Sequence, residues 1–525
     1  MKPSFLTIAG LITIAMAGLV SCSKDLNREP ANTTTAGLVF NTDSGAKEAL
    51  AKVYGAYATT SSSGPDNSDL GGIDAGTSDF VRMLFYANEF TTDEAVNAWN
   101  DPGVPDLHNM SWTSSDVILE GLYARIMYQV TVANSFIQQA SKVSFTGGAA
   151  TDLGHYVAEA RFIRAYDYYQ MMDLFGNSPF ITDKQAIGTT PTYITRADLY
   201  TYVVGELRSL DSAGSLVAPM ANEFARADQG CVWALLARIY LNAGVYAGTP
   251  DWADAVTYSS KVIGAGYSLL PKYQYNFLAD NGTSANTEQI LSISYDGTST
   301  QNYGGTTFII NAEIGGSMSP ATYGVPGGGW GGDRVTSAIV GLYPDVTGTI
   351  DSRSLFYTSG QSENIGAVGT FTDGYPNIKF QNVTSTGQTP AGASTFATTC
   401  FPLFRLPEQY LIYAEATLQG ASNGNMTNAV QYFNDLRQRA YGNTNGNVTS
   451  IALQDILDER GRELIWEGFR RSDLIRFGLF TSQSYLWPWK GGVASGTGVD
   501  AHFNLFPLSA TDVNANPNLK QNPGY

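Results

Sequence analysis

The stretch that decides the fold is the pair of segments CVWALLARIYLNA (residues 231–243) and ADAVTYSSKVI (residues 253–263). In both segments apolar residues recur at positions i, i+3 and i+4, which is the period of an amphipathic helix. Their length, and their mixture of small alanines with large apolar side chains, are typical of a tetratricopeptide unit, although a generic helix pair has the same period. We therefore expect a mostly α-helical protein with a tetratricopeptide-like scaffold.

The helical period also occurs on both sides of this pair. It extends over residues 46–57, 119–140, 156–174, 197–210, 408–419, 428–440 and 451–469. Between about residues 279 and 399 the pattern changes to short β-like pieces, residues 289–294 and 306–310, among Gly, Ser, Thr and Asn. The expected architecture is a helical scaffold around a loop-rich lobe that contains short β-strands.

The first residues have the pattern of a bacterial lipoprotein signal peptide. Lys2 precedes the apolar run 5–20, which is too short to span a membrane as a helix and is followed by Ser21 and Cys22. We expect residues 1–21 to be removed, Cys22 to carry the lipid anchor, and residues 22–40 to form a tether to the folded domain, residues 41–525. An ordinary secretory leader with an incidental cysteine is the alternative.

The composition excludes some partners and cofactors. A net charge of −17 repels phosphate backbones, so nucleic acid is not an expected partner. The three histidines lie far apart in the sequence, which does not favour a zinc site: His108, His155 and His502. Beyond Cys22 there are two cysteines, Cys231 and Cys400, which allow one disulfide at most. We expect no cofactor.

Three further segments could suggest chemistry but have simpler explanations. The charged segment 459–478 holds four carboxylates and five arginines, a mixture that favours ion pairs over catalysis. The glycine-rich loop 324–332 lacks the Gly-Lys-Ser/Thr ending of a phosphate-binding loop. The loop 280–284 could hold calcium through its oxygens, or could be an ordinary surface turn.

Three segments resemble the SusD/RagB family of outer-membrane nutrient-binding lipoproteins: ARIYLNAGVY (237–246), PLFRLPEQY (402–410) and residues 459–478. The resemblance extends over essentially the whole mature chain. Residues 88–94, 302–305 and 485–492 are most similar to the starch-binding branch of that family.

This resemblance implies a lipid-anchored protein of the outer membrane that faces the cell exterior. It further implies that the protein binds starch or other α-glucans and delivers them to a SusC-like TonB-dependent transporter, and that it is not an enzyme. The alternatives are a binder of another polysaccharide or of a peptide, and a glycoside hydrolase that uses a pair of carboxylates.

A glycan site needs aromatic rings for the apolar face of the sugar and planar polar groups for its hydroxyls. Trp99, Tyr303 and Trp330 are large aromatics in polar or glycine-rich surroundings. The glycines around Trp330 let the backbone hold its ring out. The resemblance implies that the three rings form an arc fitted to an α-glucan helix. The alternative for each ring is burial between the two lobes.

The resemblance implies that Asp74 and Arg82 correspond to family residues that make polar contacts to glucose hydroxyls. Asp74 could instead cap a turn, and Arg82 could be a surface charge on an edge strand. A further amide contact of the family falls on Pro102, whose side chain offers no hydrogen bond, so Asn100 or Asp101 is expected to replace it.

Overall fold

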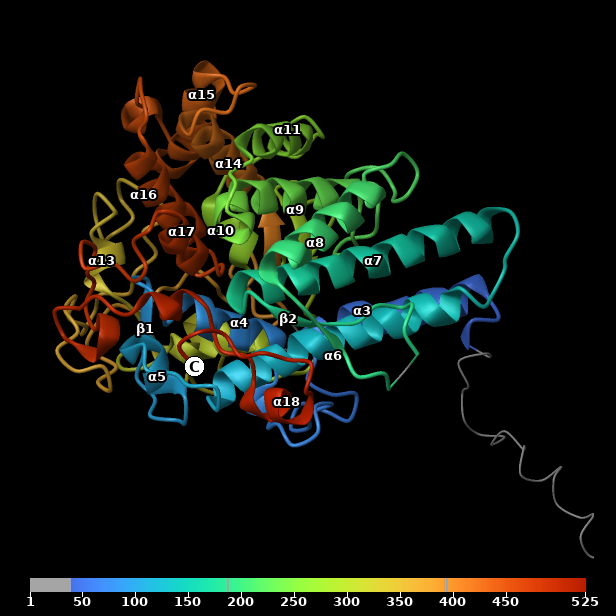
Figure 1. Ribbon diagram of the computed structural model, residues 1–525. Helices are drawn as coiled ribbons and strands as arrows, with labels where there is room; N and C mark the ends of the chain where they lie inside the picture. Colours follow the sequence, from blue (N-terminus) through green and yellow to red (C-terminus); the bar gives the residue numbers. More distant parts are fainter. Residues whose placement is uncertain (1–38, 187, 391, 393–394) are drawn as a thin grey trace, which may run out of the picture.

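The fold is built mainly from α-helices (Figure 1). The computed structural model describes residues 39–186, 188–390, 392 and 395–525. Its longer helices are α3 (Asp43–Ala58), α4 (Phe80–Glu89), α6 (Val117–Ala140), α7 (Gly148–Leu174), α8 (Arg196–Leu210), α9 (Gln229–Leu241), α11 (Trp252–Ile263), α12 (Gly305–Ala312), α14 (Leu406–Leu418), α15 (Met426–Tyr441) and α16 (Leu453–Leu464). Its shorter helices are α5 (Val104–Asn109), α10 (Ala243–Ala247), α13 (Ser337–Val340), α17 (Arg470–Arg476) and α18 (Ala510–Ala515).

The scaffold helices pack largely in chain order (Figure 1). Helix α6 lies against α7, α7 against α8, α8 against α9 and α9 against α11, while α14 packs on both α11 and α15. Ala234 and Ala237 of α9 and Ala255 of α11 are fully buried, and such small side chains allow two helices to approach closely. The predicted fold class, a mostly α-helical scaffold with a loop-rich lobe, is confirmed.

The strands are short and pair in twos within the described residues. All three pairs are antiparallel: β1 (Ala95–Asn97) with β5 (Asp333–Val335), β2 (Ser178–Phe180) with β3 (Thr192–Ile194), and β4 (Gln289–Ile293) with β6 (Phe401–Arg405). The β-like piece at 289–294 is therefore a strand, as predicted. Figure 1 shows the lobe of loops and short strands beside the helical stack, around α13 and β1.

One predicted strand is wrong. Residues 306–310 belong to helix α12, whose Phe308, Ile309 and Ile310 are all fully buried. An apolar run that is buried on every side lacks the period that would separate a strand from a helix. The backbone N–H of Gly305, which has a φ of +55°, donates to the Asp79 carboxylate at 2.8 Å and so helps to satisfy the start of this helix.

The helix predicted over 451–469 is also shorter than expected, because α16 ends at Leu464. Trp466 has a φ of +65°, which a continuing helix does not allow. Its backbone N–H donates to the Glu94 carboxylate at 3.0 Å, and the Gly468 N–H donates to Glu89 at 2.6 Å. The chain then continues as the separate helix α17.

The charged segment around α16 forms ion pairs, as predicted, but most of them are long-range and buried. Arg353 pairs with Glu459 at 2.6 Å and with Glu463 at 3.0 Å, and Arg405 pairs with Glu463 at 3.1 Å and with Glu467 at 2.7 Å. Burial alone raises the pKa of Glu459, but the guanidinium of Arg353 and two further arginines lower it to about 2. Arginines likewise lower the pKa of Glu463, so Glu459 and Glu463 are held as anions, and their ion pairs attach α16 to the loop-rich lobe and to β6.

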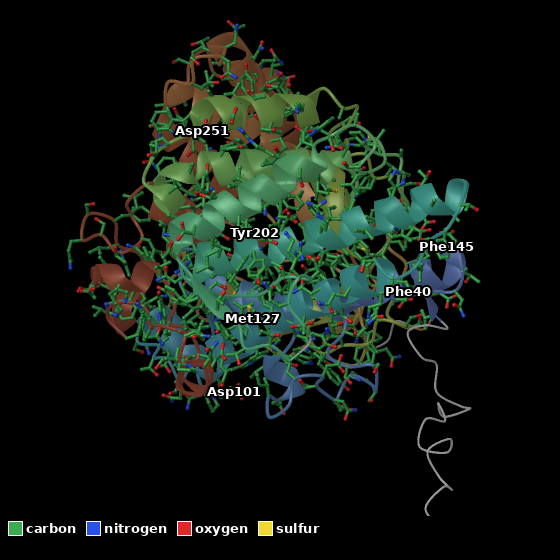
Figure 2. All side chains as sticks on the ribbon, turned by 45° about the vertical axis from the view of Figure 1, so that its right-hand side comes forward. Phe40, Asp101, Met127, Phe145, Tyr202 and Asp251 are labelled. Atoms are coloured by element: carbon green, nitrogen blue, oxygen red, sulfur yellow. The ribbon has the colours of Figure 1, made fainter. Side chains whose placement is uncertain are left out.

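The expected signal peptide, the anchor Cys22 and nearly all of the expected tether lie outside the described residues. Phe40, assigned to the tether, is buried and packs against Phe136 of α6 with ring centroids 5.5 Å apart, at the end of the molecule where the described chain begins (Figure 2). The folded core thus already includes Phe40. No helix among the described residues combines the length and apolar character needed to cross a membrane.

Candidate glycan-binding site

Two of the three predicted aromatics, Trp99 and Trp330, lie next to the two-stranded ribbon of β1 and β5. Asn97 is opposite Asp333 in its register, so Trp99 and Trp330 leave the ribbon at the same end. Their ring centroids are 6.3 Å apart at an interplanar angle of 48°, and the Trp99 indole N–H donates to the Trp330 carbonyl at 3.2 Å. Both rings are half-buried, so the glycines around Trp330 do not hold its ring fully out. Such a tilted indole pair offers an apolar surface to the face of a sugar ring.

Helix α12 links this indole pair to the third aromatic. Tyr303 lies just before α12, is 37% exposed, and has its ring centroid 5.1 Å from that of Phe396. At the other end of the helix, the Trp330 N–H donates to the Asn311 carbonyl at 2.7 Å. Eight residues at 1.5 Å each make α12 about 12 Å long. Tyr303 therefore lies about one short helix away from the two tryptophans rather than in contact with them.

The Asp79 carboxylate fixes the start of α12 to the start of α4. It accepts hydrogen bonds from the backbone N–H of Arg82 at 2.7 Å and of Gly305 at 2.8 Å, and also from the Asn302 side-chain amide. Asp79 is buried, where charge-assisted hydrogen bonds of this kind are strong. Arg82 and the Tyr303 loop are thereby held in a fixed relation to each other.

Arg82 lies on α4, not on an edge strand, and its guanidinium faces aromatic rings. Its central carbon is 4.8 Å from the Phe308 ring centroid and 5.8 Å from that of Trp99. Its Nε and Nη2 atoms donate to the Tyr86 hydroxyl at 3.3 and 3.1 Å. Burial raises the pKa of Tyr86 to about 12 although Arg82 opposes the shift, so the phenol stays neutral and accepts these bonds.

A cleft of about 410 Å³ adjoins the Arg82 side chain. This volume lies in the range of about 300–1,000 Å³ that is usual for small-ligand sites. Apolar side chains line the cleft together with three carboxylates and one guanidinium, and Figure 2 shows Asp101 at the lower edge of the molecule. The lining includes Ile73, Asp74, Arg82, Asp101, Pro102, Val117, Ile118 and Glu120.

The structure brings Asp74, Arg82 and Asp101 to this one cleft. Asp74 does cap a turn, since its carboxylate accepts from the Gly76 N–H at 2.8 Å, yet it lines the cleft as well. Asn100 is exposed but lies outside the cleft lining. Of the two candidates to supply the hydrogen bond that Pro102 does not offer, Asp101 is therefore the one next to the cleft.

Sequence reasoning missed three residues at the site: Tyr86, Phe308 and Glu120. Tyr86 is four residues after Arg82, the spacing of neighbours on one helix face, and would have been found if residues 80–89 had been assigned to a helix. Phe308 was hidden by the wrong strand assignment. Glu120 comes from α6 and has no local signal that points to Asp74 or Arg82.

The other candidate sites have structural roles. Both Asp280 carboxylate oxygens accept hydrogen bonds from Ser385, at 2.9 Å from its N–H and 2.6 Å from its hydroxyl. Among the described residues no group of three or more His, Cys, Asp or Glu side chains could hold a metal ion. Cys231 and Cys400 are free and buried, so the possible disulfide does not form.

Comparison with known proteins adds to this geometry. A family model described as the SusD family matches residues 350–525. The chain is 35% identical to the starch-binding protein SusD of Bacteroides thetaiotaomicron over an alignment of 561 positions, gaps included, that covers 98% of each chain.

Two solved structures share the fold. One is surface glycan-binding protein A from Bacteroides fluxus, with a TM-score of 0.71 and 19% identity, covering 92% of this chain and all of the other. The other is surface glycan-binding protein A from Bacteroides thetaiotaomicron in complex with laminarihexaose, with a TM-score of 0.69 and 20% identity, covering 92% of this chain and all of the other.

Proposed function

The chain belongs to the SusD family, and from this premise we propose that it is a non-catalytic lipoprotein of the outer membrane. In this proposal it captures starch or other α-glucans outside the cell and delivers them to a SusC-like TonB-dependent transporter. Residues 1–21 would be its signal peptide, Cys22 its lipid anchor and residues 22–40 its tether. Protease treatment of intact cells tests the location, because only a protein that faces the exterior is digested.

The observation that carries the proposal is the indole pair of Trp99 and Trp330 with Arg82 beside it, next to an open cleft. Each ring offers an apolar face, and the guanidinium offers planar donors to sugar hydroxyls. Hydrogen bonds to a sugar largely replace hydrogen bonds to water, so each adds little net affinity. A few ring contacts and hydrogen bonds of this kind correspond to dissociation constants between about 1 mM and 1 μM. Long glucans present many overlapping sites and should bind better than short ones.

Calorimetric titration of the protein from Ser23 onward tests the proposal, with maltoheptaose, α-cyclodextrin and a β-glucan as ligands. We expect saturable binding of the α-glucans and no new reducing ends in the mixtures. Reducing ends that appear with time would contradict the non-catalytic assignment. Laminarihexaose, the ligand bound in one structure of the same fold, makes a β-glucan binder the second candidate function, which stronger binding of the β-glucan would favour.

Replacement of Trp330 by Ala tests the site itself. We expect maltoheptaose affinity to fall by about tenfold or more, because half of the indole surface is lost. Trp252→Ala is the matched control, since Trp252 is also half-buried but lies on α11. Equal affinity of the Trp330→Ala variant and the wild type would remove Trp330 from the site.

A further inference from the structure

The two tryptophans are joined to one buried pair of polar side chains, Asn97 and Asp333, in the β1–β5 ribbon. The Asn97 amide donates to the Asp333 carboxylate at 2.5 Å, and the two residues are opposite each other in the register. Asn97 is 1% exposed and Asp333 is fully buried. A buried hydrogen bond between an amide and a carboxylate is costly to break, because each group would be left unpaired without gaining water.

The side-chain oxygen of Asn97 binds the backbone of Trp99 directly. It accepts the backbone N–H of Trp99 at 2.7 Å, while the Ala98 N–H donates to the Gly332 carbonyl at 2.9 Å. The side chain of Asn97 therefore spans the ribbon from Asp333 to Trp99.

Gly332 leaves the room that this arrangement needs. A Cβ at this position would lie 2.7 Å from the Asn97 amide nitrogen and 2.7 Å from the Trp99 ring. The Trp99 ring is thus packed onto the backbone of Gly332, just before β5, and its indole N–H donates to the Trp330 carbonyl. Through this chain of contacts, a change at position 97 or 333 is transmitted to both rings.

No cationic side chain forms an ion pair with Asp333 among the described residues. The neighbouring Arg334 donates instead to backbone carbonyls, among them those of Gly332 at 2.6 Å and Asp373 at 2.9 Å. The second carboxylate oxygen of Asp333 has no partner in the described protein. Asn97 is therefore the direct side-chain partner that fixes Asp333, and Asp333 is the one that orients the Asn97 amide.

We infer that Asn97 and Asp333 are positioning residues of the glycan site: their hydrogen bond holds Trp99 and Trp330 at the separation and tilt that a sugar ring requires. The effect on glycan affinity rests on the proposed function, whereas the effect on the indole pair does not. Both residues are buried and cannot touch a glycan, so they act through the half-buried tryptophans.

Exchange of the two side chains tests this inference. In the double variant N97D/D333N the amide and the carboxylate change places, so the carboxylate at position 97 can accept both the Trp99 N–H and the new amide at position 333. We expect Asn97→Ala and Asp333→Ala to lower maltoheptaose affinity by about tenfold. The single variant Asn97→Asp, which places two carboxyls face to face, should lower it as well, and the exchanged pair should restore affinity to within about threefold of the wild type.

Hydrogen exchange of the Trp99 indole N–H, followed by NMR, is the readout that needs no ligand. It should accelerate in the three single variants and return toward the wild-type rate in N97D/D333N. Asn434→Ala is the matched control: Asn434 is a buried amide of α15 that bonds Val448 through both of its polar atoms at 2.9 Å. This control should lower the free energy of unfolding but leave both indole exchange and affinity unchanged.

The outcomes separate the two proposals. Normal indole exchange in Asn97→Ala, or an exchanged pair that is no better than the single variants, would overturn the positioning role. If the wild type binds no α-glucan, the proposed function fails, and the indole exchange rates still decide whether Asn97 and Asp333 hold the two rings.

Discussion

At the scale of single residues, the fold keeps some carboxyl groups near the two tryptophans out of water. Glu313 follows α12 directly and is fully buried, and neither of its carboxylate oxygens has a partner among the described residues. Burial raises the pKa of this carboxyl well above its usual range, and the nearby Asp333 adds to the shift. Glu313 is therefore a neutral acid at the pH where an exposed glutamate is ionised.

Replacement of Glu313 by Gln tests this protonation state. Folding raises the pKa of this carboxyl, so its full contribution to stability is present below the unfolded pKa of about 4.3. The contribution is lost as the pH rises from the unfolded toward the folded pKa. The loss is about 1.4 kcal/mol for each unit by which folding raises the pKa. Gln stays neutral at every pH. We expect the free energy of unfolding of Glu313→Gln, measured in urea, to rise relative to that of the wild type as the pH increases from about 5 to about 8.

The exposed Glu363 provides the control for this measurement. Glu363→Gln should show the same dependence of stability on pH as the wild type. A difference between Glu313→Gln and the wild type that stays constant with pH would mean that Glu313 is ionised throughout this range.

At the scale of elements, buried ion pairs attach α16 to β6 and to the loop-rich lobe. Arg405, the last residue of β6, pairs with Glu288 at 2.6 Å as well as with Glu463 and Glu467 of the α16 region. Arg405 and these carboxylates are almost completely buried. Glu463 also pairs with Arg353, Glu288 with Arg439 and Glu467 with Lys379. Removal of Arg405 therefore leaves three buried carboxylates with only part of their positive charge compensation, which is costly in a site without water.

Replacement of Arg405 by Met should therefore lower the free energy of unfolding by about 3–5 kcal/mol. The exposed ion pair of Lys47 with Glu223 is the matched control, and Lys47→Met should cost no more than about 1 kcal/mol. Urea unfolding curves measure both values. If both variants lost the same free energy of unfolding, the buried ion pairs of Arg405 would stabilise the fold no more than an exposed pair does.

At the scale of the whole molecule, charge restricts what the protein can bind. The chain has a net charge of −17, and the cleft beside Arg82 is rimmed by Asp74, Asp101 and Glu120. A single guanidinium does not offset three carboxylates and the negative field of the whole chain. The charge of this cleft therefore favours neutral ligands over anionic ones.

A charge-modified ligand tests this restriction. Malto-oligosaccharides whose primary alcohols are oxidised to carboxylates should bind about tenfold or more weakly than their neutral parents at low salt, and the difference should shrink as salt screens the repulsion. Asp101→Asn should narrow the difference, whereas Asp152→Asn, on α7 outside the cleft, should leave it unchanged. Equal binding of both ligands by the wild type would contradict the electrostatic argument.

The sequence by itself determined most of the longer helices and the family, but not α4 or α12. The period of apolar residues is a local property, so the pair 231–243 and 253–263 predicted α9 and α11 within a few residues, and the motifs around 402–410 and 459–478 identified the family. The candidate residues Asp74, Arg82, Trp99, Tyr303 and Trp330 also came from the sequence. Where an apolar run was buried on all sides, as at 306–310, the period failed and α12 was assigned to a strand.

Only the tertiary structure decided how these residues meet. Asn97 and Asp333 are 236 positions apart, yet their hydrogen bond sets the geometry of both tryptophans. Arg405 pairs with carboxylates 58 to 117 positions away, and Glu120 reaches the cleft from α6. Such contacts leave no local pattern, because they depend on which surfaces of distant elements pack together, and that is settled by the fold as a whole.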